Sequence, residues 1–113
     1  MKLSVLMPVY NEQAGLEAIL RRVHAVPVDK EIVVVDDCST DDTAGILERV
    51  DLPDVKVFRH SVNQGKGAAI RTAIAAAQGD AIIIQDADLE YSPEEYPQLL
   101  APILSGDFVI VYG

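Results

Sequence analysis

Short apolar runs recur along the 113-residue chain and predict five β-strands. The runs are rich in Val and Ile, and several show no strict alternation of apolar and polar positions. That pattern is typical of strands buried on both faces of a parallel sheet. The expected strands cover residues 3–9, 31–35, 55–59, 81–85 and 107–112.

Between these runs, apolar residues return with the period of an amphipathic helix. The spacing i, i+3, i+4, i+7 occurs at Leu16, Ile19, Leu20 and Val23, and again at Ile70, Ala73, Ile74 and Ala77. A shorter stripe at residues 46–50 follows a predicted capping box at residues 39–42. Gly79 is expected to end the helix before it in a left-handed conformation.

Strand and helix therefore alternate, with short connections, from one end of the chain to the other. This order predicts an α/β fold in which a mostly parallel sheet is flanked by helices, in one domain over residues 1–113. A last helix is expected over residues 92–103, shortened or distorted by Pro97 and Pro102. The chain ends just after its fifth predicted strand, so we expect a fragment of a longer protein.

Composition narrows the classes of partner. The formal net charge of −9 argues against binding to the phosphate backbone of a nucleic acid. An acidic protein can still bind an anionic nucleotide when a divalent cation lies between them. The single cysteine, Cys38, fits a reducing compartment, and no apolar stretch has the length needed to cross a bilayer. We therefore expect a soluble, cytoplasmic domain.

Candidate chemistry gathers where the predicted strands end. In an open parallel sheet, ligands bind beyond the carboxyl ends of the strands. Four segments follow such ends: residues 8–12, 36–39, 63–67 and 86–90. Three of them carry acids, and the other carries glycines with Lys66, which makes this edge the predicted site.

Asp86, Asp88 and Glu90 alternate with apolar residues, so an extended backbone would direct the three carboxylates to one side. Hard oxygen ligands suit Mg²⁺ or Mn²⁺, which also bridge to phosphate oxygens. A solvated acidic turn before a capped helix is the alternative interpretation.

The other segments each allow two interpretations. Gly65 and Gly67 open a predicted helix, where small residues let backbone donors approach a phosphate, or simply let the helix pack closely. Asp36 and Asp37 could bind a base or ribose, or could cap the next helix. Asn11-Glu12 is expected at the start of the first helix, where a carboxylate interacts favourably with the helix dipole whether or not a ligand is bound.

Taken in order, the four segments resemble the family 2 glycosyltransferases of the GT-A fold, a Rossmann-like fold that binds nucleoside-diphosphate sugars. The segments are Pro-Val-Tyr-Asn-Glu at 8–12, Val-Val-Asp-Asp-Cys-Ser-Thr-Asp-Asp-Thr at 34–43, Asn-Gln-Gly-Lys-Gly at 63–67 and Asp-Ala-Asp at 86–88. Residues 89–97 and 111–113 are similar to the polyprenyl-phosphate branch of the family, which includes dolichyl-phosphate mannose synthases.

The resemblance implies a set of site residues. The base of a UDP- or GDP-sugar would lie near Pro8, Tyr10, Glu12 and Asp37, and Lys66 would face either the diphosphate or solvent. On the other side of the nucleotide, Asp86 and Ala87 would contact the ribose and phosphate. Asp88 would hold the catalytic Mg²⁺ or Mn²⁺, with Glu90 as a second metal ligand.

The resemblance also implies an activity, which is inverting transfer of a hexose to an acceptor, either a polyprenyl phosphate or a glycan. The acceptor region of the family would follow residue 113, so we expect this chain to be inactive alone and the longer protein to act at the inner face of the membrane. A homodimer formed through apolar surface is a further hypothesis. A non-catalytic nucleotide-binding or regulatory module is the alternative, whereas a signalling receiver domain is disfavoured because its acidic pair follows the first strand.

Overall fold

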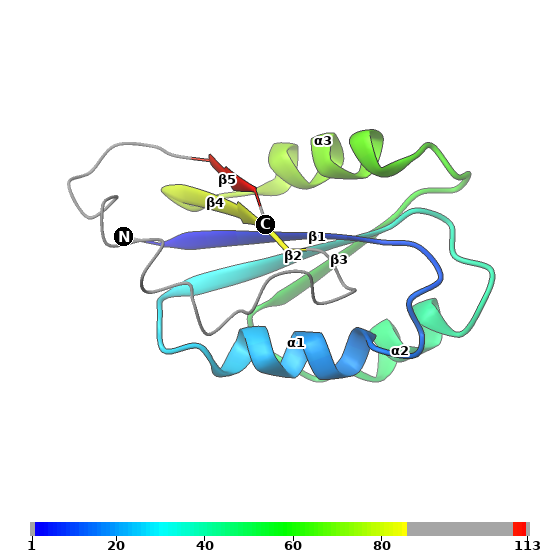
Figure 1. Cartoon of the computed structure of the whole chain (residues 1–113), viewed down its shortest axis with the longest axis horizontal. Coiled ribbons are helices and arrows are strands. Elements are labelled where there is room, and N and C mark those ends of the chain that lie inside the picture. The colour runs from blue at the N-terminus through cyan, green and yellow to red at the C-terminus, as the bar shows by residue number, and fades with distance from the viewer. Residues whose placement is uncertain (1, 86–109, 113) are drawn as a thin grey trace.

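One five-stranded sheet forms the centre of the molecule (Figure 1). The structure, a computed structural model, describes residues 2–85 and 110–112. The strand order is β3-β2-β1-β4-β5, and every pair of neighbours is parallel. The strands are β1 (Leu3–Val9), β2 (Lys30–Asp36), β3 (Val55–Arg59), β4 (Ala81–Ile84) and β5 (Ile110–Tyr112).

The predicted α/β fold with a parallel sheet of about five strands is confirmed. The first four predicted strands end within one residue of the observed ones. The fifth predicted strand is observed over its last three residues, and its first three, residues 107–109, lie outside the described part of the chain. The predicted helix at residues 92–103 also lies outside it.

Helices cover both faces of the sheet, and each face has its own apolar core (Figure 1). Helices α1 (Leu16–Ala25) and α2 (Thr43–Arg49) lie on one face, and α3 (Lys66–Ala76) lies on the other. Successive strand residues point to opposite faces, so β1, β2 and β4 contribute to both cores and their side chains are almost all buried. The unbroken apolar runs of the sequence reflect this double burial.

Strand β3 is the exception, and its predicted burial on both faces is wrong. It lies at the edge of the sheet, where Val57 is 44% exposed and Phe58 39% exposed. Helix α3 packs over β1 and β2, so it leaves the outer part of β3 uncovered.

The helical stripes are confirmed for α1 but only partly for α3. All four predicted residues of α1 are buried, whereas Ile74 of α3 is 41% exposed. The buried face of α3 is formed by Ala68, Ala69 and Ala73, whose small side chains let the helix backbone approach the sheet. Helix α1 also begins at Leu16, so the expected helix start at Asn11-Glu12 is wrong.

Two predicted helix caps differ from the observed ones. Gly79 is not left-handed; among the described glycines, that conformation occurs at Gly65, with φ of 92°. At the start of α2, Asp42 makes no side-chain cap, and the Thr43 N–H instead donates to Asp41 Oδ1 at 2.9 Å. Within the described residues, no helix has the length and apolar character needed to cross a membrane.

Candidate functional site

Three loops lie together at the carboxyl edge of the sheet, on the right of Figure 1. They follow β1, β2 and β3 and cover residues 10–15, 37–42 and 60–65. Strand β4 ends towards the same edge, where the Gln85 N–H donates to the Leu6 carbonyl at 2.9 Å. The parallel sheet thus places three of the four predicted motif segments at one edge, as the sequence predicts, and the fourth, residues 86–90, lies outside the described residues.

Asn11 joins the first loop to the second. It adopts a left-handed conformation with φ of 53°, which asparagine tolerates better than most residues. Its N–H donates to Ser39 Oγ at 2.9 Å, and its side-chain oxygen accepts the N–H of Thr40 at 2.8 Å and of Asp41 at 3.3 Å. One strained residue therefore fixes the backbone of both loops.

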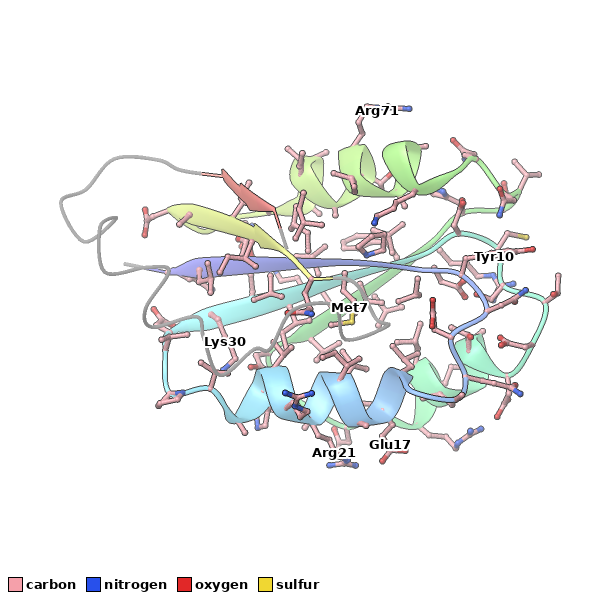
Figure 2. All side chains as sticks on the ribbon, viewed as in Figure 1. Met7, Tyr10, Glu17, Arg21, Lys30 and Arg71 are labelled. Carbon is pink, nitrogen blue, oxygen red and sulfur yellow. The ribbon has the colours of Figure 1, made fainter. Side chains whose placement is uncertain are left out.

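Further hydrogen bonds extend this connection towards α2. The Glu12 N–H donates to Thr43 Oγ1 at 2.9 Å, and Gln13 Oε1 accepts the Asp42 N–H at 2.9 Å. Tyr10 lies at this edge with 45% of its surface exposed (Figure 2). The loops thus present an exposed aromatic side chain on a backbone held from two sides, which is a suitable surface for stacking a nucleotide base.

Asp36 is the last residue of β2, and its buried carboxylate serves the fold. Its Oδ1 accepts the N–H and the hydroxyl of Ser39 at 2.9 and 2.6 Å. Its Oδ2 pairs with Arg59 at 3.2 Å, and Arg59 is its direct neighbour in β3. These contacts stabilise the loop after β2, but α2 begins only at Thr43, so the interpretation of Asp36 as a helix cap is wrong.

Asp37 is also buried, at 3% exposure, and it holds the start of α3. Its Oδ1 accepts the Gln64 N–H at 2.9 Å, and its Oδ2 accepts the Gly65 N–H at 2.8 Å. Burial by itself would raise the Asp37 pKa, but hydrogen bonds from Gln64, His60 and Gly65 outweigh it and lower the pKa below its usual value. The two N–H groups that a phosphate could have used are therefore bound to Asp37.

His60 is the residue of this edge that the sequence interpretation missed. It follows β3 and is buried, with Nδ1 2.8 Å from Asp37 Oδ1 and Nε2 2.8 Å from Thr72 Oγ1. In the sequence it looks isolated, because its partners are 23 and 12 residues away. Its place directly after a strand end was the available signal.

The remaining predicted residues lie as follows. Pro8 is buried within β1 and pairs with Val35 of β2, so its side chain is not exposed at the edge. Glu12 is half-buried in the first loop, and Lys66 is exposed as the first residue of α3. The predicted nucleotide and metal residues Asp86, Ala87, Asp88 and Glu90 lie outside the described residues.

No cluster of three or more His, Cys, Asp or Glu side chains suited to a metal ion occurs among residues 2–85. The assignment of Asp88 and Glu90 as metal ligands therefore stays a prediction. Asp36, Asp37 and Asp41 all accept hydrogen bonds from backbone N–H groups. Much of the acidic character of this edge therefore comes from carboxylates that stabilise its loops.

The class of protein follows from comparison of the whole sequence. Residues 4–113 match the family described as glycosyl transferase family 2, and the chain belongs to this family. The resemblance inferred from the four ordered segments is confirmed.

Relatives within the family agree in sequence and in fold. An undecaprenyl-phosphate 4-deoxy-4-formamido-L-arabinose transferase of Pseudomonas fluorescens is 43% identical over 106 residues, which are 87% of this chain and 31% of that protein. The crystal structure of Staphylococcus aureus TarS (residues 1–349) in complex with UDP has a TM-score of 0.80 and 31% identity, over 93% of this chain and 32% of that one.

A second solved structure contains a metal. The mannosyltransferase PcManGT from Pyrobaculum calidifontis, in complex with GDP-Man and Mn²⁺, has a TM-score of 0.75 and 28% identity, over 88% of this chain and 32% of that one. The GT-A fold and the similarity to the polyprenyl-phosphate branch are thereby confirmed. The chain spans about a third of the length of each of these relatives.

Proposed function

We propose that the chain forms the donor-binding part of an inverting, metal-dependent hexosyltransferase. It would bind a UDP- or GDP-sugar at the carboxyl edge of its sheet, and the longer protein would transfer the hexose to a polyprenyl phosphate. The observation that carries the proposal is the meeting of three hydrogen-bonded loops at this edge, in a chain whose residues 4–113 match glycosyl transferase family 2.

The relatives support the choice of donor and acceptor. The names of the two solved structures include UDP in one case and GDP-Man with Mn²⁺ in the other. The name of the Pseudomonas relative includes undecaprenyl phosphate, which supports a polyprenyl phosphate as the acceptor proposed here.

The reaction requires little from a general base. A phosphate monoester has a second pKa of about 6, so the acceptor oxygen is largely ionised at neutral pH. That oxygen would attack the anomeric carbon while the bond from this carbon to the diphosphate breaks, and the nucleoside diphosphate would leave. A divalent cation bound through Asp88 and Glu90 would supply charge to stabilise the leaving diphosphate.

Thermal unfolding with and without ligand tests the proposal. UDP or GDP with Mn²⁺ should raise the melting temperature, because a ligand at 100 times its Kd stabilises the folded state by about 2.7 kcal/mol. Chelation of the metal, or Asp88→Ala, should remove most of this stabilisation.

Asp51→Ala is a matched control, since it removes an equally charged, exposed side chain from the loop before β3, at the opposite edge of the sheet. It should leave the ligand-induced shift unchanged. If neither nucleotide raises the melting temperature, the donor-site proposal is wrong. If stabilisation survives both chelation and Asp88→Ala, the metal assignment is wrong.

A further inference from the structure

We propose that His60 is a positioning residue of the donor site, which holds the start of α3 so that Lys66 and the first turn of the helix face the diphosphate of the donor. This inference rests on the function proposed above and adds a residue to the same site. None of the segments that define the predicted site includes His60 or its partner Thr72.

A closed ring of contacts carries the inference. Asp37, at the end of β2, accepts the Gly65 N–H at 2.8 Å and lies 2.8 Å from His60 Nδ1. The other ring nitrogen of His60 lies 2.8 Å from the hydroxyl of Thr72. Asp37 and His60 therefore contact α3 at two points. Asp37 contacts its N-cap residue Gly65, and His60 contacts Thr72 in the middle of the helix.

The two points lie at different positions along the helix axis. Gly65 and Thr72 are seven residues apart, which is about two turns of an α-helix. A helix held at two points two turns apart cannot rotate about its axis or swing at its start without breaking one of the contacts. The ring thus fixes the direction in which the helix start points.

The carboxylate of Asp37 and both ring nitrogens of His60 have partners. Asp37 Oδ1 lies within hydrogen-bond distance of both Gln64 N and His60 Nδ1, so the carboxylate is held from two sides. His60 is 9% exposed, and loss of a partner for a buried ring nitrogen would be costly. The hydroxyl of Thr72 can donate or accept, so it can satisfy Nε2 in whichever protonation state the ring takes.

The ring affects function because it sets the position of Lys66. It directly follows Gly65, whose φ of 92° sets the direction in which the chain enters α3. A change in the Asp37–Gly65 contact therefore moves Lys66 and the N–H groups of the first turn together. The base side of the site is held by other contacts, those of Asn11 with Ser39 and Thr40, and neither His60 nor Thr72 takes part in them.

Because the diphosphate side and the base side are held by different contacts, loss of His60 should affect them differently, which a purely structural role would not produce. Loss of His60 should weaken binding of a nucleoside diphosphate in the presence of Mn²⁺ on the order of tenfold, the scale on which supporting hydrogen bonds usually act. Binding of the corresponding nucleoside, which has no phosphate, should change little. The probes are UDP against uridine and GDP against guanosine, measured well below the melting temperature.

A graded set of variants assigns the effect to the ring. His60→Ala removes both contacts, whereas His60→Asn keeps an amide donor near the position of Nδ1 and loses the contact with Thr72. Thr72→Val removes the hydroxyl at nearly constant shape, and Thr72→Ser restores it. We expect the largest loss for His60→Ala, intermediate losses for His60→Asn and Thr72→Val, and wild-type affinity for Thr72→Ser.

Amide NMR shifts of Gln64 and Gly65 report on the ring without any ligand, and they should move in His60→Ala and stay in place in Thr72→Ser. If wild type binds the nucleoside diphosphate and His60→Ala binds it equally well, the inference is wrong while the proposed function stands. Equal losses for diphosphate and nucleoside would show general disruption and also overturn it. A wild-type chain that binds neither UDP nor GDP overturns the proposed function and this inference with it.

Discussion

Glu31 is a buried carboxylate near the amino end of β2, far from the loops of the candidate site. It accepts a hydrogen bond from Ser4 Oγ at 2.6 Å and one from the Gln78 N–H at 2.5 Å, and it pairs with Lys56 at 2.7 Å. Burial would raise its pKa, but the hydrogen bonds from Lys56, Ser4 and Gln78 and the charge of Lys56 outweigh it and lower the pKa to about 2.

This depressed pKa predicts a loss of stability in acid. In the unfolded chain the group has its ordinary pKa of 4.5, so between pH 4.5 and about 2 the unfolded state binds the proton more readily. The contribution of Glu31, about 3 kcal/mol for a shift of this size, is fully present above pH 5 and disappears as the pH falls towards 2.

Urea unfolding of wild type and Glu31→Gln at a series of pH values measures this contribution. The variant should be less stable at pH 7, and the difference in free energy of unfolding should shrink between pH 5 and 2. Glu48→Gln, at an exposed position of α2, is the control and should follow wild type throughout. A constant difference between wild type and Glu31→Gln over this range would contradict the prediction.

Gly79 and Gly67 should respond in opposite directions to alanine. A Cβ at Gly79 would lie 2.6 Å from Ser4 Oγ and 2.7 Å from the Lys2 carbonyl oxygen, so the strand or the turn must shift. We expect Gly79→Ala to lower the free energy of unfolding by about 1–3 kcal/mol. A Cβ at Gly67 would lie 3.5 Å from the Arg71 guanidinium, an ordinary contact distance, so Gly67→Ala should stabilise α3 by up to about 1 kcal/mol. Thermal unfolding of both variants checks the sign of each change.

At this scale the sequence identified Asp37 as important but assigned it to the nucleotide. The observed partners of Asp37 are His60, Gln64 and Gly65, which reach it from a loop more than 20 residues away. Local sequence patterns carry no information on such a contact, because it depends on how β2 and β3 lie side by side. The same reason applies to Glu31 and Lys56, which meet across neighbouring strands.

Lys30 stabilises the end of an element. It is the first residue of β2, and Figure 2 shows it at the end of the sheet opposite Tyr10. Its ammonium group donates to the carbonyl oxygens of His24 and Val26, both at 2.9 Å, and lies 3.7 Å from Asp54. The side chain is only 5% exposed, so these bonds to the C-terminal carbonyls of α1 are shielded from water.

Lys30→Met should therefore lower the free energy of unfolding by about 1–3 kcal/mol, since it leaves two carbonyls and Asp54 without this donor. Arg49→Met is the control, because the pair of Arg49 with Asp42 is more than half exposed on both sides and such pairs contribute at most about 1 kcal/mol. Urea unfolding at pH 7 measures both. Equal effects of the two substitutions would contradict the shielding argument.

The sequence predicted the positions of the secondary-structure elements well. For β1, β2 and β4 this is because burial on both faces leaves a continuous apolar run. The errors occurred where burial depends on position in the sheet. Strand β3 lies at the edge, and its two charged residues, Lys56 and Arg59, were the available signal because charged side chains are common on edge strands. In α3 the alanines form the buried face, and hydrophobicity alone favoured the larger Ile74.

At the scale of the whole molecule, the parallel sheet separates two sets of loops. The loops after β1, β2 and β3 lie at the carboxyl edge, and hydrogen bonds join the first to the second and the second to the third. The loops before β2, β3 and β4, at residues 26–29, 50–54 and 77–80, lie at the amino edge with Glu31 and Lys30 close by. Both edges contain buried charged side chains, and the carboxyl edge in addition exposes Tyr10 and Lys66.

This division predicts where a bound nucleotide will slow amide hydrogen exchange. Addition of UDP or GDP with Mn²⁺ should protect residues 10–15, 37–42 and 60–65 together, because ordering one of these loops restrains the others through their shared hydrogen bonds. The amino-edge loops at 26–29, 50–54 and 77–80 serve as an internal control and should exchange at unchanged rates. Protection confined to the amino edge would place the ligand on the wrong side of the sheet. Protection of one carboxyl-edge loop without its neighbours would show that the observed hydrogen bonds do not couple them.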